Sequence, residues 1–382
     1  MPVRLGVIGL GNMGTAHCRT IESISEIDLV AVSDIRRVRV DKLTERYGCA
    51  GYDDPFALIG SGRCDAVLIA TPHYDHTSLG IAALKRGLHV LVEKPISAQK
   101  SDCEKLIKAH CNPNQVFAAM FNQRTNRHYQ KIRQMIQDGS LGNVRRFSWT
   151  ITDWFRPQSY YNSGGWRATW AGEGGGVLLN QSPHQLDLMQ WLFGMPSQVH
   201  AFCEFGKYHD IEVEDSVTAR LKYDSGTEGL FVTTTGEAPG LNRLEISAEN
   251  GLLVYDTADS AIRFKRNDKS ITQAIAENAP FSAPQTQDIE VLVTGKGKQH
   301  MEVLENFAAA ILQGEPLIAP AAEGIASVEL ANAMLLSGVT EKPISLPLSS
   351  RRYAAQLKKW VASSRYKLDA PEADVEDLSK SF

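Results

Sequence analysis

The sequence predicts an α/β protein with two domains. The N-terminal domain is expected to be doubly wound around a parallel sheet, and the C-terminal domain to be α+β around a mostly antiparallel, open-faced sheet. Three observations favour this fold class: apolar runs alternate with helical patterns up to about residue 120, a glycine-rich turn follows the first run, and closely spaced strand patterns begin after residue 123. A chain of 382 residues is also too long for a single domain with one compact core. We place the domains at 1–122 and 123–369, followed by a loose acidic tail at 370–382.

The first domain is expected to alternate strand and helix. Its strands are nearly free of polar residues, as is typical of a parallel sheet that is covered on both faces. The predicted strands are 3–8, 29–33, 65–70, 89–92 and 116–120, and the predicted helices are 15–24, 36–47, 79–86 and 101–110. Ligands of such sheets bind beyond the carboxyl ends of the strands.

The turn after the first strand reads Gly9-Leu10-Gly11-Asn12-Met13-Gly14. Gly9 permits a tight turn, Gly11 allows the backbone to approach a pyrophosphate, and Gly14 allows close packing of helix on strand. The N-terminus of the helix that follows offers free N–H groups and the positive end of its dipole to the phosphates, and Asn12 and Met13 of the turn are candidate cofactor-binding residues. The sequence therefore predicts a dinucleotide site. The alternative is a glycine turn that binds nothing.

Asp34 ends the second predicted strand, twenty residues after Gly14. A carboxylate at this place accepts hydrogen bonds from ribose hydroxyls and repels a 2′-phosphate. It favours NAD as the cofactor, with NADP less favoured, although Arg36 and Arg37 nearby soften that preference.

The second domain begins with a predicted helix at 129–137. Strand patterns then follow one another, separated by hairpin signals such as Asp224-Ser225-Gly226. The predicted strands are 145–154, 198–205, 216–223, 229–235, 243–248 and 251–255, and helical periodicity returns at 301–312 and 324–336.

Composition narrows the class of protein. The chain has 40 basic and 44 acidic side chains and a formal net charge of −4, without a basic stripe, so we expect no nucleic-acid partner. The six cysteines form no CxxC pair, which favours a reducing compartment and argues against structural zinc. No apolar run approaches the roughly twenty residues of a membrane span, and no signal-peptide pattern opens the chain. We therefore expect a cytoplasmic protein with no membrane partner.

Lys94 follows the fourth predicted strand in the motif Glu93-Lys94-Pro95. Its ammonium could point into the cleft beside a nicotinamide, where a cation stabilises the alkoxide-like oxygen of a hydroxyl that is losing hydride from its carbon. The alternative is a surface lysine paired with Glu93.

His184 is the candidate general base, because imidazole titrates near neutral pH. Helical spacing places Asn180, His184 and Asp187 near one face. Asp187 then either holds the imidazole in one tautomer or simply stabilises the helix. Ser182-Pro183-His184-Gln185 resembles a capping box, which indicates a helix that starts at Ser182.

Aromatic and arginine side chains gather before a triple glycine. Such a group suits stacking on the C–H faces of a sugar, with arginines for hydroxyls, a carboxylate or phosphate. Core packing or a subunit interface is the alternative. The residues are Trp154, Phe155, Arg156, Tyr160, Tyr161, Trp166, Arg167 and Trp170.

Taken together, the fingerprint at 9–14, the Thr71-Pro72 loop, Glu93-Lys94-Pro95 and the segment 174–187 (GGGVLLNQSPHQLD) resemble the glucose–fructose oxidoreductase/inositol dehydrogenase/MocA (Gfo/Idh/MocA) family over nearly the whole chain. The resemblance implies a Rossmann domain for NAD(P), an open-faced sheet domain, sugar or cyclitol chemistry in the cleft between them, and a homo-oligomer, a dimer or tetramer, built through the open sheet face. It also implies a helix that starts just after the glycines, with a distortion near Pro183, and we favour that start.

The resemblance and the residue chemistry together define the expected site. The catalytic candidates are Lys94, His184 and Asn180. The cofactor-binding candidates are Gly9, Gly11, Asn12, Met13, Asp34, Thr71, Pro72, His73, His76, Glu93, Lys94, Asn122, Trp166 and Arg167. The substrate-binding candidates are Lys94, Arg124, Trp154, Arg156, Tyr161, Asn180 and His184. We expect no metal: His73, Asp75 and His76 have suitable side chains, but the family keeps this loop against the cofactor.

Asn180 departs from the aspartate of inositol-dehydrogenase-like members, so the proton is expected to pass through His184 or Lys94 while Asn180 orients a hydroxyl. These features predict an NAD-dependent dehydrogenase for a secondary alcohol of a sugar, sugar derivative or cyclitol. An NAD-dependent glycoside-cleaving enzyme with recycled cofactor is the alternative. A non-catalytic NAD-binding regulator is less consistent with the retention of Lys94 and His184.

Overall fold

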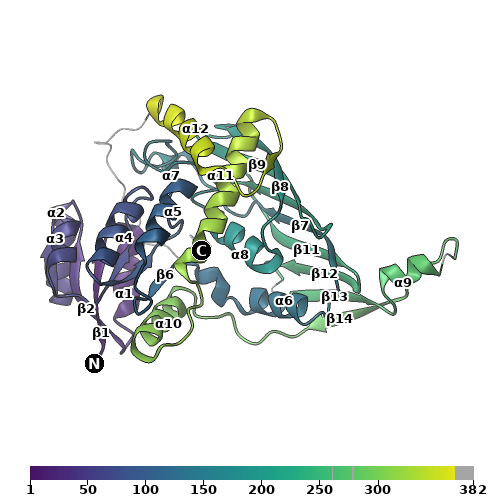
Figure 1. Ribbon diagram of the computed structural model, residues 1–382, viewed down its shortest axis with the longest axis horizontal. Helices are drawn as coiled ribbons and strands as arrows, with labels where there is room; N and C mark the ends of the chain where they lie inside the picture. Colours follow the sequence, from purple (N-terminus) through teal and green to yellow (C-terminus); the bar gives the residue numbers. More distant parts are fainter. Residues whose placement is uncertain (260, 278, 366–382) are drawn as a thin grey trace.

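The computed structural model describes residues 1–259, 261–277 and 279–365, so the tail predicted at 370–382 lies outside the described residues. Two sheets dominate it: a six-stranded sheet formed by the N-terminal third and a nine-stranded sheet formed by the rest, side by side in Figure 1. Within the described residues, no helix combines the length and the apolar character needed to cross a membrane.

The six-stranded sheet is parallel, in the order β3-β2-β1-β4-β5-β6. Its strands are β1 (Val3–Ile8), β2 (Ile27–Ser33), β3 (Ala50–Tyr52), β4 (Ala66–Ile69), β5 (His89–Val92) and β6 (Phe117–Ala119). The helices between them are α1 (Asn12–Ile21), α2 (Arg37–Tyr47), α3 (Pro55–Gly60), α4 (Asp75–Lys85) and α5 (Lys100–Ala109). The strand order reverses between β1 and β4, and this switch point is where the carboxyl ends of a doubly wound sheet bind ligands.

Apolar side chains bury both faces of this sheet, which explains its nearly continuous apolar strands. One buried cluster joins the sheet to α3, α4 and α5, and another joins it to α1 and α2. The predicted parallel fold is confirmed. The sequence patterns missed β3 and α3, which are three and six residues long.

The nine-stranded sheet has the order β14-β13-β12-β11-β7-β10-β9-β8-β15 and is antiparallel except for the central pair β7 and β10, so the expected mostly antiparallel sheet is confirmed. Its strands are β7 (Val144–Ile151), β8 (Gln198–Phe205), β9 (Glu214–Lys222), β10 (Glu228–Thr234), β11 (Asn242–Ala248), β12 (Gly251–Asp256), β13 (Ala261–Asn267), β14 (Thr286–Val291) and β15 (Ile344–Ser345). The remaining helices are η1 (Asn122–Thr125), α6 (Arg127–Gln137), α7 (Gln158–Tyr161), α8 (Pro183–Phe193), α9 (Ile271–Ala276), α10 (His300–Gln313), η2 (Ala321–Glu323), α11 (Gly324–Thr340) and α12 (Ser350–Ala362).

One face of the nine-stranded sheet is covered and the other is open. Alternate strand residues, such as Phe147, Trp149 and Phe231, pack into one apolar core with α6, α8 and α11. Side chains on the opposite face stay exposed, and Phe202 is 64% and Leu230 41% accessible. The expected open-faced sheet is therefore present.

Helix α10 changes the predicted division at residue 122. Helix α10 follows β14 in the chain, after eight of the nine strands of the second sheet. Its apolar face (Val303, Leu304 and Phe307) nevertheless packs on the first domain, against α1 and β1. Figure 1 shows α10 below the six-stranded sheet, on the side of α1. The first domain is thus completed by residues from the C-terminal part of the chain.

The start of helix α8 corrects one expectation. We favoured a helix that begins just after the glycines at 174–176, whereas α8 begins at Pro183. Proline fits the first position because its missing N–H is not needed there. The capping-box reading therefore located the start correctly, but the Ser182 hydroxyl bonds Thr233 Oγ1 at 2.9 Å and does not cap the helix.

Candidate active site

Two glycines of the turn after β1 lie at positions where a side chain would not fit. Gly9 has φ +90°, and a Cβ there would lie 2.7 Å from the Ala70 carbonyl carbon, so a side chain is excluded by both conformation and contact. A Cβ on Gly14 would lie 1.8 Å from the oxygen of Gly9, which explains the glycine in the first turn of α1. Helix α1 begins at Asn12 without a side-chain cap, so its first N–H groups are available to a phosphate.

Asp34 lies at the end of β2 and is nearly buried. One carboxylate oxygen accepts the Leu10 N–H at 2.7 Å and the other accepts the Arg36 N–H at 2.8 Å. Arg39 approaches the same carboxylate at 3.6 Å. Asp34 therefore ties the glycine turn to the end of β2.

The loop after β4 carries Thr71, Pro72 and His73, and His76 follows in the first turn of α4. The two ring nitrogens of His76 lie 2.9 Å from the Pro95 oxygen and 2.8 Å from the Thr71 oxygen, so the buried ring links this loop to the Lys94–Pro95 turn. We assigned His76 to cofactor binding, but its ring nitrogens face main-chain oxygens. Its place in the structure is therefore that of a loop-positioning residue.

His73 joins the two domains, because its Nδ1 lies 3.0 Å from the main-chain oxygen of Glu173 and its ring lies 6.4 Å from that of Trp166. Burial, and then the charges of His76 and Lys94, lower the pKa of His73 to about 3.

The buried, neutral His73 predicts a loss of stability in acid. Below about pH 6.5 the unfolded chain binds a proton at this histidine, whereas the folded protein does not until about pH 3. The stability it contributes is thus present above about pH 6.5 and is lost as the pH falls, at up to about 1.4 kcal/mol per pH unit. Urea unfolding at pH 7 and pH 5 should show a smaller difference in His73→Gln than in the wild type. Equal differences would contradict the prediction.

Glu93 and Lys94 follow β5 directly. Glu93 is buried and lies 2.6 Å from His17 Nε2 of α1, and its other oxygen accepts the Lys94 N–H at 3.0 Å. Although burial opposes ionisation, the hydrogen bond and charge of His17 and the charge of Lys94 lower the pKa of Glu93 to about 2. Glu93 therefore stays ionised and orients the Lys94 backbone.

The Lys94 ammonium points across to the second domain, where its Nζ donates to the main-chain oxygen of Asn180 at 3.1 Å. Burial lowers the pKa of Lys94, and the carboxylates of Glu93 and Glu173 partly counter that effect. The alternative of an exposed lysine in a surface ion pair is therefore not what the structure shows.

His184 lies in the first turn of α8 and is 5% exposed. Its ring packs edge-on against Phe121 at 6.2 Å. Its buried Nδ1 has no hydrogen-bond partner among the described residues. Burial, and then the charge of Lys94, lower its pKa well below 6.5, so the ring is neutral at pH 7.

The structure corrects the roles that we expected for Asp187 and Arg124. Asp187 does not hold the His184 ring: both of its oxygens accept from Arg124, at 2.7 Å each, and this pair is buried. Arg124 also donates to Glu323 at 2.6 Å and to the Ile318 oxygen at 3.2 Å. We expected Arg124 to bind substrate, but these contacts occupy its guanidinium, so it joins η1, α8 and η2 instead.

Asn180 contacts a carboxylate that the sequence reasoning missed. Its Nδ2 donates a short hydrogen bond to Glu173 Oε1, and its Oδ1 accepts from Tyr160 at 3.3 Å and from Gln181 at 3.0 Å. Arg167 in turn donates to the Tyr160 hydroxyl at 3.0 Å. An acid placed directly before the triple glycine was the only sequence signal for Glu173.

The aromatic loop lies beside this network. Arg156 and Arg167 both approach the Tyr160 ring, at 5.2 and 4.7 Å, and Arg167 also lies over Trp166. Neither arginine has an acidic partner within 4 Å among the described residues. Tyr161 is buried and its hydroxyl bonds Thr235 at 2.7 Å, so this hydroxyl is already engaged.

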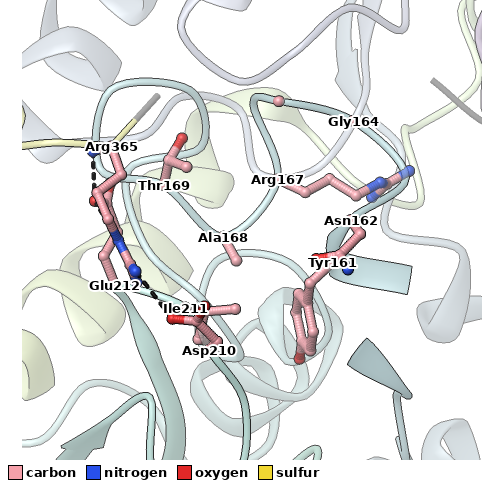
Figure 2. Close-up of a pocket in the computed structure, with 11 residues that line it drawn as sticks. Tyr161, Asn162, Gly164, Arg167, Ala168, Thr169, Asp210, Ile211, Glu212 and Arg365 are labelled. Atoms are coloured by element: carbon pink, nitrogen blue, oxygen red, sulfur yellow. Dashed lines mark hydrogen bonds and ion pairs between the residues drawn. The ribbon is translucent and has the colours of Figure 1, made fainter. Parts of the chain in front are cut away.

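A cavity of about 320 Å³ opens behind the loop (Figure 2). Tyr161 and Arg167 line it, together with Asp210, Glu212 and Arg365. The dashed lines join Arg365 to Asp210 by an ion pair and to Glu212 by a hydrogen bond of its main-chain N–H. Because Arg167 also reaches Tyr160, one residue links this cavity to the Asn180 network.

Ten buried side-chain polar atoms have no hydrogen-bond partner among the described residues. Among the described residues they include atoms from four expected site residues: Thr71 Oγ1, Asn122 Oδ1, Trp154 Nε1 and His184 Nδ1. Buried polar groups are normally satisfied, so this set fits a polar ligand. Asn122 is also joined through its Nδ2 to Gln299 at 2.9 Å, a residue that no sequence signal marked. Together with the uncapped start of α1 and with Asp34, these atoms fit a dinucleotide.

In the part of the chain that the structure describes, no three His, Cys, Asp or Glu side chains are grouped so as to hold a metal ion.

Comparison with known families adds to this geometry. Residues 3–121 match the model of the oxidoreductase family with the NAD-binding Rossmann fold, and residues 129–254 match the Gfo/Idh/MocA C-terminal domain. The chain belongs to this family. Gfo/Idh/MocA proteins are NAD-binding oxidoreductases by the family's description, and the resemblance inferred from the motifs is confirmed.

Relatives within the Gfo/Idh/MocA family include sugar and cyclitol dehydrogenases. The chain is 28% identical to the myo-inositol 2-dehydrogenase of Thermotoga maritima over 66% of this chain and 75% of that one. It is also 28% identical to the D-glucoside 3-dehydrogenase of Escherichia coli over 68% of this chain and 77% of that one. The WlbA dehydrogenase of Chromobacterium violaceum, solved with NADH and UDP-GlcNAcA, superposes with a TM-score of 0.79 at 26% identity, covering 91% of this chain and 97% of that one.

Proposed function

We propose that this Gfo/Idh/MocA protein is an NAD-dependent dehydrogenase that oxidises a secondary alcohol of a sugar, sugar derivative or cyclitol. One observation carries the proposal. Lys94 of the first domain contacts the main chain at Asn180 of the second, four residues before a buried, neutral His184. The contact joins Lys94 to the segment that leads to His184, and the charge of Lys94 contributes to the lowered pKa of that histidine.

Each side chain has a distinct role in this proposal. His184 accepts the proton of the substrate hydroxyl, because its ring is neutral at pH 7 and its buried Nδ1 has no protein partner among the described residues. Lys94 stabilises the negative charge that develops on the same oxygen. Bound NAD supplies the hydride acceptor.

The cofactor would be held by the glycine turn, Asp34 and the loop after β4. The N-terminus of α1 would bind the pyrophosphate, and Asp34 would accept from the ribose hydroxyls. Trp166, Arg167 and Asn122 border the same region through their contacts with His73, Tyr160 and Gln299.

Asp34 is expected to set the preference for NAD over NADP. Asp34→Ser removes the charge that repels a 2′-phosphate and leaves Arg36 and Arg39 beside the pocket. The ratio of the NADPH to the NADH dissociation constant, measured by fluorescence titration, should fall about tenfold or more, as expected for an effect of about 1.4 kcal/mol. A ratio that does not change would remove Asp34 from the cofactor site.

The substrate class follows from the relatives and from the aromatic loop. Trp154, Arg156 and Trp166 lie beside the Asn180 network, as expected for a site that stacks on a sugar and binds its hydroxyls.

A panel assay tests the function directly. The protein is incubated with NAD and with free sugars, cyclitols, anhydrosugars and glycosides while NADH and released aglycone are followed. NADH formation supports the dehydrogenase. Aglycone release without net NADH would instead indicate the glycoside-cleaving cycle, and NAD binding without any turnover would indicate a regulator.

We further propose that the protein is a cytoplasmic homo-oligomer that assembles through its open sheet face. The exposed Phe202 and Leu230 on that face support the assembly, and six cysteines without disulfides support a reducing compartment. Light scattering of the wild type and of Phe202→Glu/Leu230→Glu tests the interface, since a monomeric variant is the expected result.

A further inference from the structure

Glu173 is a buried carboxylate for which the proposed reaction does not yet have a role. It lies immediately before the triple glycine and is 2% exposed. Its Oε2 accepts the Ala168 N–H at 2.7 Å, and its Oε1 accepts from Asn180 Nδ2. Burying a carboxylate is costly unless hydrogen bonds and charges compensate for it, so its place beside the site requires a reason.

The carboxylate determines how the Asn180 amide is oriented. Burial raises the pKa of Glu173, and the charges of Arg167 and Lys94 and the hydrogen bonds from Asn180 and Ala168 counter that effect. Since the ionised carboxylate can only accept hydrogen bonds, the NH₂ group of Asn180 faces Glu173. The amide oxygen then faces the opposite way and accepts from Gln181 and Tyr160.

Asn180 passes this restraint to Lys94. Its side chain contacts Glu173, and its main-chain oxygen accepts from Lys94 Nζ at 3.1 Å. Glu173 itself forms no ion pair with Lys94 within 4 Å, so Asn180 is the link between the two.

We propose that Glu173 is a positioning residue of this site, which orients Asn180, through it fixes the Lys94 ammonium, and supplies negative charge beside Lys94 and Arg167. The inference rests on the proposed dehydrogenase function. It also accounts for the amide at position 180. An aspartate there would place two carboxylates in contact and raise the pKa of one of them, whereas an amide donates to Glu173.

The charges around Lys94 determine what removal of Glu173 should do. Glu93 and Glu173 favour the protonated amine, while burial and the charges of Arg167 and Arg156 oppose it. His73 and His184, whose pKa values are also affected by Lys94, are both neutral at pH 7. Loss of the Glu173 charge therefore leaves more of Lys94 as free amine.

Chemical labelling of Lys94 measures this without any substrate. The full-length protein is treated briefly with acetic anhydride between pH 7 and pH 10, and acetylation of the Lys94 peptide is followed by mass spectrometry. In Glu173→Gln, labelling at pH 8 should rise about threefold or more, because a larger fraction of Lys94 is then free amine.

Glu212→Gln is the matched control. Glu212 also supports the aromatic loop, by accepting the Trp170 N–H at 2.6 Å, but it does not contact Asn180. Its labelling profile should match the wild type. An equal rise in Glu212→Gln would mean that a loosened loop exposes Lys94, which would overturn the proposal.

A charge exchange completes the test. In Glu173→Gln/Asn180→Asp the amide and the carboxylate change places, so the hydrogen-bonded pair and the buried charge both remain, and the variant is expected to fold even if Glu173→Gln does not. Its Lys94 profile should return to that of the wild type. A profile that stays shifted, or a folded Glu173→Gln without a shift, would overturn the inference. Because labelling needs no turnover, absent dehydrogenase activity with these shifts intact would refute only the proposed function.

Discussion

Replacing Lys94 by alanine is expected to lower kcat/KM for the substrate found in the panel assay by about 1000-fold, while NADH still binds. The expected loss is large because the ammonium stabilises charge that develops only during the reaction, and no other cation donates to the Asn180 oxygen in the described residues. Steady-state kinetics and NADH fluorescence titration measure the two quantities separately.

Lys85→Ala, at the exposed end of α4, is the control for this prediction, and its kinetics should match the wild type. A Lys94→Ala enzyme that keeps more than about a tenth of the wild-type kcat/KM would show that the hydroxyl is activated elsewhere in the site.

The largest effect on stability is expected at Asp187. Asp187→Ala leaves Arg124 with its guanidinium buried and its bidentate partner removed, and should lower the free energy of unfolding by about 3 to 5 kcal/mol. Urea unfolding monitored by tryptophan fluorescence measures the change.

The double variant Arg124→Met/Asp187→Leu should recover most of that loss, because it removes both charges and leaves only Glu323, which is half-exposed. If Arg124 were instead a substrate ligand, as we expected from the sequence, Arg124→Met would raise KM. Asp187→Ala would then be about as stable as the wild type.

Local patterns were sufficient for most of the first domain. Apolar runs and the glycine turn located five of its six strands, because a parallel strand buried on both faces has few polar residues. Strand β3 (Ala50–Tyr52) was missed because three residues are too short for any periodicity to appear. At Pro183 the local capping signal indicated the helix start better than the family pattern did.

The site was predictable where chemistry follows directly from a motif. Lys94 Nζ donates to the main-chain oxygen of Asn180, and the charge of Lys94 contributes to the lowered pKa of His184. The partners of these residues were not predictable, since Arg124 and Asp187 lie 63 residues apart and only the packing of η1 against α8 brings them into contact. Asp187 therefore looked like a partner of its helical neighbour rather than of Arg124.

Helix α10 has a consequence for how the chain can be made and divided. Its residues Val303, Leu304 and Phe307 complete the buried cluster that α1 and α2 form on one face of the N-terminal sheet. During synthesis, the part of that face that α10 covers therefore stays exposed after residue 122 until about 190 further residues have followed. A fragment that ends at residue 122 would leave that part of the sheet exposed to solvent and should aggregate. In a permuted chain with α10 joined ahead of β1, the helix would be synthesised before the sheet and could cover it at once.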